Sequence, residues 1–365
     1  MSLETSFERV ELPLDEPFGI SRGTTVTTEN VVVRIDDGEH VGVGGAAPST
    51  HYGETVDTVE AVLPDLLGAV TDLGDPLAVD AAHDRMAEVV RDNPAAKAAV
   101  DVALHDLAAK RADLPLYRYL GLDPRNAVTS SFTVSLADVE RMRTRAEEAV
   151  AAGYGVLKVK LGSEPDEDRA IVEAVRAAAP DATVRVDANE AWTPREAVRK
   201  SEWLADFDVE FLEQPVPAED PEGLRFVYER SAVPVAADES CITAEDVPRV
   251  ADRTDIVTLK LMKTGGVRPA IEAVHAARAH GLEVMLGCML ESNASIAAGA
   301  HLAPLLDYAD LDGSLLLAED PFDGVPMPDG HLDPGRFEAA GTGAHEGSGP
   351  GSESDTGTAD GDVDG

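Results

Sequence analysis

Residues 157–162 read LKVKLG, a short apolar run in which every second residue is a lysine. Side chains of a β-strand alternate between its two faces, so Lys158 and Lys160 are predicted to project from the same side. Two like charges on one face raise each other's energy unless a neighbouring group uses or neutralises them. The run therefore predicts a buried strand whose polar end has a chemical task.

This strand is one of a series. Short runs such as TVRVDAN (183–189) and VEFLEQP (209–215) alternate with alanine-rich amphipathic stretches such as DRAIVEAVRAAAP (168–180). This alternation predicts a parallel sheet with helical crossovers, and seven or eight such units close most naturally into a barrel whose strand ends converge on one mouth. The polar residues that end the runs follow one another at steps of 27, 26, 25 and 22 residues: Lys160, Asp187, Glu213, Asp238 and Lys260.

The chain before and after this series has a different texture. Turn signals and alternating positions up to about residue 50 predict a small antiparallel sheet, and a helical pattern follows to about residue 120. We expect an α+β domain over residues 1–125 and the barrel over residues 126–335. Residues 336–365 are rich in Gly, Ser and acidic residues and predict a disordered tail.

The composition argues against several kinds of partner. The chain has 69 acidic and 30 basic residues and a formal net charge of -39. Such a surface repels nucleic acid and anionic membranes, and acidity with few lysines is typical of adaptation to high salt. No apolar stretch reaches the roughly 18 residues of a membrane span, and the N-terminus lacks a secretory pattern. We expect a halophilic, cytoplasmic homo-oligomer with no nucleic-acid or membrane partner.

Three acidic residues close successive predicted strands: Asp187, Glu213 and Asp238. Converging carboxylates repel one another unless a cation lies between them. Ligation by oxygen alone favours Mg²⁺ or Mn²⁺ over zinc. Helix capping is the alternative for each position by itself, but three acids in succession beside lysines favour a metal site.

Two lysines are predicted to flank that site. If TSSFTVSL (129–136) is the first barrel strand, Lys160 ends the second and Lys260 the sixth, on opposite sides of an eight-stranded ring. One amine could then take a proton from an α-carbon and the other return it to the opposite face, through an enediolate that the metal stabilises. Desolvation and the charge of Lys158 would lower the pKa of Lys160. A strand edge or a salt bridge is the alternative for the lysine pair.

The ordered motifs KxK, DAN, EQP and ADES, with a lysine ahead of KxGG, resemble the enolase superfamily and its muconate lactonizing enzyme subgroup. The resemblance covers about residues 5–325. It implies a modified TIM-type (β/α)7β barrel with an N-terminal α+β capping domain.

Within the subgroup, the last strand is similar to that of dipeptide epimerases of the L-Ala-D/L-Glu epimerase type. YADLDGSLLL (308–317) carries a DxD whose two carboxylates, in those enzymes, hold the free ammonium of the substrate. PFGISRG (17–23) matches a loop whose arginine can pair with an acidic side chain of the second residue. A helix or turn cap is the alternative for the DxD, and a solvent-exposed side chain for the arginine. The residues that the resemblance assigns to substrate binding are Asp310, Asp312, Arg22, Thr133 and Glu291.

The resemblance implies a Mg²⁺-dependent dipeptide epimerase, with Mn²⁺ as an alternative cation, that inverts the α-carbon of the C-terminal residue of an Ala-Glu-like dipeptide. An o-succinylbenzoate synthase or N-acylamino acid racemase shares the metal and the lysines but binds no free ammonium. Muconate cycloisomerase is a third alternative. A catalytically silent barrel that acts as a binding protein is the non-enzymatic one.

Overall fold

A computed structural model describes residues 3–163 and 165–347 of the chain. The N-terminal part is an antiparallel sheet followed by helices, as the sequence predicts. Its sheet consists of β1 (Glu4–Ile20), β2 (Gly23–Asp36) and β3 (Val41–Ala46). After the short 3-10 turn η1 (Thr50–Tyr52) come α1 (Val56–Leu73), α2 (Val79–Val89), α3 (Pro94–Arg111) and α4 (Leu116–Tyr119).

The second part is a nearly closed barrel of parallel strands that follow one another in chain order. Ser131, before the first strand, donates its backbone N–H to the carbonyl of Ala309 in the last, which closes the ring. The strands are β5 (Phe132–Val134), β6 (Val156–Lys160), β7 (Thr183–Asp187), β8 (Val209–Glu213), β9 (Val235–Ala237), β10 (Ile256–Lys260), β11 (Glu283–Gly287) and β12 (Tyr308–Asp310).

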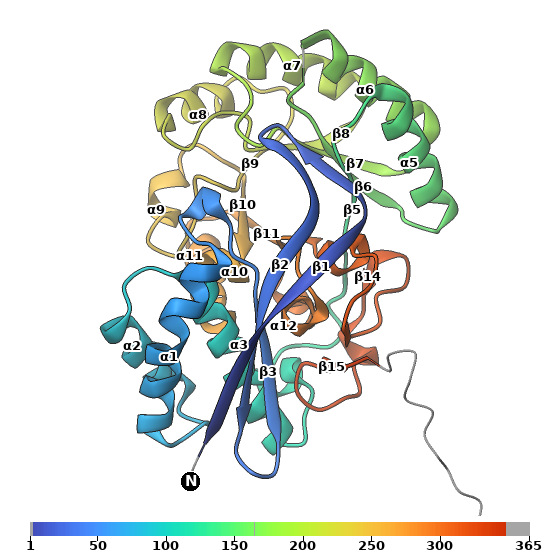
Figure 1. The fold of residues 1–365 in the computed structure, drawn as a ribbon. Coiled ribbons are helices and arrows are strands. Elements are labelled where there is room, and N and C mark those ends of the chain that lie inside the picture. The colour runs from blue at the N-terminus through green and yellow to red at the C-terminus, as the bar shows by residue number, and fades with distance from the viewer. Residues whose placement is uncertain (1–2, 164, 348–365) are drawn as a thin grey trace, which may run out of the picture.

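Helices connect these strands and cover the outside of the barrel (Figure 1). They are α5 (Val139–Ala151), α6 (Pro165–Ala178), α7 (Pro194–Asp206), α8 (Pro221–Tyr228), α9 (Val247–Val250), α11 (Val267–Ala279) and α12 (Asn293–Ala300), with an added turn, α10 (Leu261–Thr264), after β10. The start of α7 is fixed by its own sequence: Thr193 and Glu196 form a capping box, and Pro194 occupies the first turn, where its missing N–H costs no hydrogen bond. The (β/α)7β architecture is confirmed.

In strand β6 the side chains alternate between the hydrophobic core outside the barrel wall and the interior of the barrel. Leu157 and Val159 are fully buried in the core that also contains Met142 of α5 and Ile171 of α6. The other face therefore points into the barrel. Lys158 and Lys160 share that face, as the sequence predicts, and both contact Asp187.

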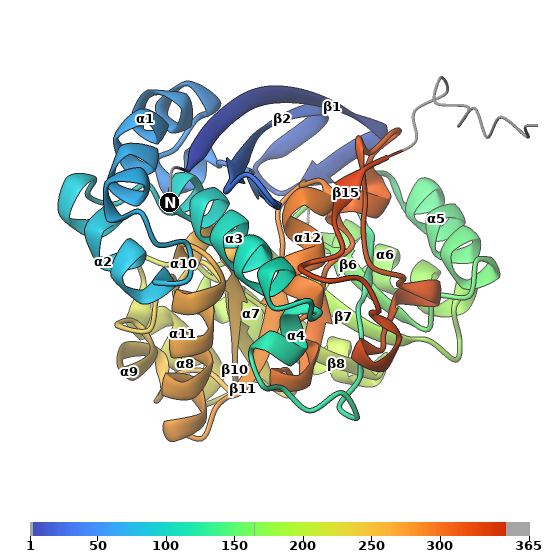
Figure 2. The ribbon, with the colours of Figure 1, turned by 90° about the horizontal axis from the view of Figure 1, so that it is seen from below.

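The hairpin of β1 and β2 lies across one end of the barrel (Figures 1 and 2). At its turn, Ser21 Oγ and Arg22 Nη1 donate hydrogen bonds to the carbonyl of Asn189, which follows β7. The approach is close enough to require glycine at position 19, where a Cβ would lie 2.1 Å from the carbonyl oxygen of Leu136. The hairpin thus covers the mouth at which the strand ends meet.

The structure corrects the predicted start of the tail, because residues 336–347 pack against the rest of the molecule. Phe337 and Ala344 are buried. Thr342 donates its backbone N–H to Asp106 Oδ1 at 2.7 Å. These few apolar and hydroxyl groups anchor a segment whose average composition suggested no core contacts. The remainder of the predicted tail, 348–365, lies outside the described residues.

The remaining elements before, within and after the barrel are short: β4 (Val128–Thr129), η2 (Ala303–Leu305), η3 (Gly313–Leu316), β13 (Phe322–Asp323), η4 (Pro328–Gly330), β14 (His331–Leu332), η5 (Pro334–Arg336) and β15 (His345–Glu346). Strand β14 pairs with β4 and β15 with β13, both antiparallel. None of the helices in the described part of the chain combines the length and the apolar character that a membrane crossing needs.

Candidate active site

Three carboxylates converge at the carboxyl end of the barrel. Asp187 ends β7, Glu213 ends β8 and Asp238 directly follows β9, and all three are fully buried. Each offers an oxygen within 4.8 Å of the oxygens offered by the other two. The structure therefore brings together the three acids that the sequence assigns to a metal site.

The surroundings of Glu213 fit a divalent cation. Its Oε2 lies 2.8 Å from Lys158 Nζ, yet the geometry makes no hydrogen bond, and neither oxygen accepts one from any described residue. Burial raises the pKa of Glu213 to about 7, with Lys158 lowering it and Asp187 and Asp238 raising it. Buried carboxylate oxygens without donors are the ligands that Mg²⁺ prefers.

Lys160 and Lys260 contact this cluster from opposite strands of the barrel. Lys160 Nζ donates to Asp187 Oδ2 at 2.6 Å, and Lys260 Nζ donates to Asp238 Oδ2 at 2.8 Å. Burial lowers the pKa of Lys260, but Asp238 and other nearby groups outweigh burial and hold the pKa well above its ordinary value. Each amine thus faces the carboxylate cluster, one from the second strand and one from the sixth.

Lys158 lies deeper in the barrel, with its side chain 1% exposed. Its Nζ is 2.7 Å from Asp310, 2.8 Å from Glu213 and 3.3 Å from Asp187. Burial lowers the pKa of Lys158, but the charges of Asp310 and Glu213 outweigh burial. The pKa therefore lies well above its ordinary value, and the amine stays charged. Lys158 is therefore a fixed cation that joins the three-carboxylate cluster to the last barrel strand. That it tunes Lys160 stays a prediction.

Lys263, the lysine of the KxGG motif to which the sequence alone assigned no role, supports the site. Its completely buried Nζ donates to Oδ1 and to the carbonyl of Asp238, both at 2.6 Å, and to the carbonyls of Cys241 and Thr258. It fixes the orientation of Asp238 from behind. The available signal was the second lysine of TLKLMKTGG (258–266), because a lysine inside an apolar run needs acceptors.

The two aspartates of the DxD motif have unequal partners. Asp310 accepts hydrogen bonds from Lys158 and from Ser131 Oγ, whereas Asp312 accepts one from the backbone N–H of Thr133 at 2.6 Å. Burial raises the pKa of both, but for Asp310 the lysines outweigh burial and the pKa falls. For Asp312 burial and the charge of Asp310 raise the pKa to about 7. Among the described residues, no cation forms an ion pair with Asp312, the second carboxylate of the motif.

A cavity of about 340 Å³ is bordered by Lys158, Asp310 and Asp312, whereas the three carboxylates of the cluster lie behind its lining. Lys160 and Lys260 border it, and so do Thr133 and Arg22, both expected from the sequence. Glu291 does not border it; its oxygens accept hydrogen bonds from Met289 N in the same loop and from Ser295 Oγ of α12. Apolar side chains complete the wall: Phe18, Ile20, Ala47, Pro48, Met289, Leu290 and Leu316.

Comparisons with known proteins agree with this geometry. Residues 2–121 match the model described as "Mandelate racemase / muconate lactonizing enzyme, N-terminal domain", and residues 141–345 match "Enolase C-terminal domain-like". A hydrophobic dipeptide epimerase of Roseobacter litoralis is 39% identical over 90% of this chain and 95% of its own length. The L-Ala-D/L-Glu epimerase of Escherichia coli is 36% identical over 84% and 92%.

Two solved structures are similar over nearly their whole length. A dipeptide epimerase of Enterococcus faecalis, complexed with Mg and the dipeptide L-Leu-L-Tyr, has a TM-score of 0.89 at 34% identity and covers 95% of this chain and 100% of its own. A substrate-liganded L-Ala-D/L-Glu epimerase of Bacillus subtilis has a TM-score of 0.89 at 32% identity, covering 95% and 99%.

Proposed function

The chain belongs to the mandelate racemase / muconate lactonizing enzyme family of the enolase superfamily, and from this premise we propose that it is a Mg²⁺-dependent dipeptide epimerase. The enzyme inverts the α-carbon of the C-terminal residue. The observation that carries the proposal is the placement of Lys160 and Lys260, which contact the cluster of three carboxylates from opposite strands of the barrel. Such a pair can reach both faces of one carbon atom.

Asp187, Glu213 and Asp238 would hold the cation, Mg²⁺ or alternatively Mn²⁺. A bound divalent cation supplies positive charge that favours removal of a proton next to the substrate carboxylate. One of Lys160 and Lys260, in its uncharged form, takes the α-proton from one face, and the other, in its charged form, gives a proton to the opposite face. Lys158 keeps the carboxylates in place and compensates their charge.

Asp312, with Asp310 beside it, would bind the free ammonium of the dipeptide. A buried ammonium needs negative charge close by, and Asp312 borders the cavity with no ion-pair partner in the described part of the chain. The same charge opposes the acyl or succinyl groups of N-acylamino acid racemase and o-succinylbenzoate synthase substrates. Thr133 holds Asp312 in position through its backbone N–H.

The experiment that tests the proposal is α-proton exchange in D₂O with a dipeptide library, with N-acetylated dipeptides and the o-succinylbenzoate precursor included. We expect deuterium to enter only the C-terminal residue of free dipeptides. Equal or better exchange with N-acetylated compounds would contradict the assignment and favour the acylamino acid chemistry.

We further propose that the protein works as a homo-oligomer in the cytoplasm of a cell adapted to high salt, with a two-domain division at residues 125 and 126. The net charge of -39 supports the salt adaptation. Activity and molecular mass measured across a range of KCl concentrations test both the salt optimum and the assembly.

A further inference from the structure

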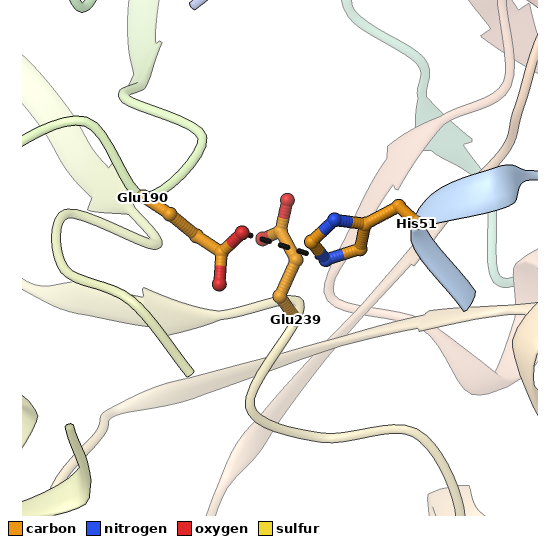
Figure 3. Close-up of side chains that lie close together, drawn as sticks. All are labelled: His51, Glu190 and Glu239. Atoms are coloured by element: carbon orange, nitrogen blue, oxygen red, sulfur yellow. Dashed lines mark ion pairs between the residues drawn. The ribbon is translucent and has the colours of Figure 1, made fainter. Parts of the chain in front are cut away.

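A charged cluster lies beside the cavity, on the side of β7 and β9. It consists of Arg22, His51, Glu190 and Glu239, and we name it the Arg22 cluster. Its members come from the turn between β1 and β2, from η1, and from the loops after β7 and β9. Figure 3 shows that the side chains of His51, Glu190 and Glu239 point toward one another.

Both terminal nitrogens of the Arg22 guanidinium donate hydrogen bonds to protein groups. Nη1 donates to Glu190 Oε2 at 2.9 Å and to the carbonyl of Asn189 at 3.1 Å. Nη2 donates to Glu239 Oε1 at 2.9 Å. Glu190 is itself anchored, because its Oε1 accepts a hydrogen bond from the backbone N–H of Ala218 at 2.8 Å. Arg22 is therefore held in place by fixed acceptors.

The charges of the cluster leave no positive excess for an anionic ligand. Glu239 is buried, and its carboxylate directly contacts the Arg22 guanidinium. Two carboxylates, those of Glu190 and Glu239, therefore face a single guanidinium. His51 Nε2 lies 3.4 Å from Glu190 Oε2. Arg22 is already the cation between the two glutamates, so their charge requires no metal ion.

The topology places this cluster across the mouth from the ammonium site. Asp310 and Asp312 belong to the end of β12, which adjoins β5, whereas β7 to β9 lie on the far side of the ring. A dipeptide with its ammonium at Asp312 and its α-carbon between the two lysines therefore directs its C-terminal residue toward Arg22. Phe18 and Ile20, just before Arg22 in the chain, give this end of the cavity an apolar wall.

We infer that Glu190 and Glu239, by keeping Arg22 paired, make dipeptides with an uncharged C-terminal side chain better substrates than dipeptides with an acidic one. The inference rests on the proposed function and narrows its substrate class. It departs from the Ala-Glu-like substrate that Arg22 by itself implies. A substrate carboxylate at this end would have to displace a fixed glutamate from the guanidinium or approach two negative charges.

Glu190 is the residue through which the inference is tested, because Glu239 directly follows Asp238 of the metal cluster. Glu190→Gln keeps an oxygen for Ala218 but removes the charge that neutralises Arg22. The control is Glu202→Gln, which removes one charge from an exposed position of α7. Epimerisation of L-Ala-L-Leu and L-Ala-L-Glu is measured as kcat/KM at about pH 8 with Mg²⁺, for the wild type and both variants.

We expect the wild type to favour Ala-Leu, and Glu190→Gln to raise the Ala-Glu to Ala-Leu ratio about tenfold, which corresponds to about 1.4 kcal/mol. Glu202→Gln should leave the ratio unchanged. A wild type that prefers Ala-Glu tenfold, or a ratio unaffected by Glu190→Gln, would overturn the inference and leave the epimerase assignment standing. The wild-type ratio needs no variant, so a folding defect does not obscure the result. Failure of every dipeptide to exchange would overturn the proposed function, and the inference with it.

Discussion

Replacement of Asp312 by Asn tests the ammonium site at its most informative position. Asp310 is already paired with Lys158 at 2.7 Å, so the charge available to a substrate ammonium rests mainly on Asp312. Asn retains an oxygen that can accept the hydrogen bond from Thr133 N, and it has nearly the same volume. The variant should therefore fold normally while it loses one negative charge in a buried position.

The magnitude follows from the cost of breaking a desolvated ion pair. Removing one partner of such a pair costs about 2–5 kcal/mol. At about 1.4 kcal/mol per tenfold, kcat/KM for a free dipeptide should fall by roughly 30-fold or more. N-acetylation of the dipeptide should reduce kcat/KM of the wild type comparably, because it removes the same charge from the ligand.

The assay is a two-by-two comparison of wild type and Asp312→Asn with a dipeptide and its N-acetyl form. If the two charges interact, the second change should cost far less than the first. Asp181→Asn, at an exposed position before β7, is the matched control and should have no effect. Additive losses, or a variant as active as the wild type on free dipeptides, would refute the reasoning.

Three further predictions concern the three-carboxylate cluster, the two lysines and the buried His301, which directly follows α12. Asp187→Asn should greatly reduce Mg²⁺ affinity and abolish turnover with the fold intact, and unchanged Mg²⁺ binding by calorimetry would contradict its role as a ligand. Lys160→Ala and Lys260→Ala should each stop epimerisation but still exchange the α-proton of one enantiomer with solvent, so epimerisation by both at wild-type rates would exclude the two-base mechanism. Burial lowers the pKa of His301 to about 4 in the folded protein, while its Nδ1 accepts from Tyr117 N. The unfolded chain therefore binds more protons than the folded one between about pH 6.5 and 4, and stability should decrease as pH falls through that window by about 1.4 kcal/mol per unit of pKa difference. Denaturant titrations across this range check the slope, and His301→Gln should flatten it.

Much of the site could be predicted because a parallel barrel converts order along the chain into position at the mouth. Asp187, Glu213 and Asp238 are far apart in sequence, but each ends a strand or directly follows one, and the carboxyl ends of neighbouring strands meet. Strand alternation likewise places Lys158 and Lys160 on one face. Local periodicity is sufficient for these inferences, since they need only the strand ends and the order of the strands.

Contacts between distant segments were decided by the tertiary structure alone. Arg22 meets Glu190 and Glu239 across 168 and 217 residues, and Lys158 meets Asp310 across 152. Whether a charged side chain is free or paired depends on which loops fold over it, and no local pattern around Arg22 contains that information. The sequence by itself determined the barrel, its three converging carboxylates and its opposed lysines, because these follow from strand order. Only the folded chain decided the charge around the substrate side chain. That charge is the sum of the charges on loops that become neighbours only when the chain folds.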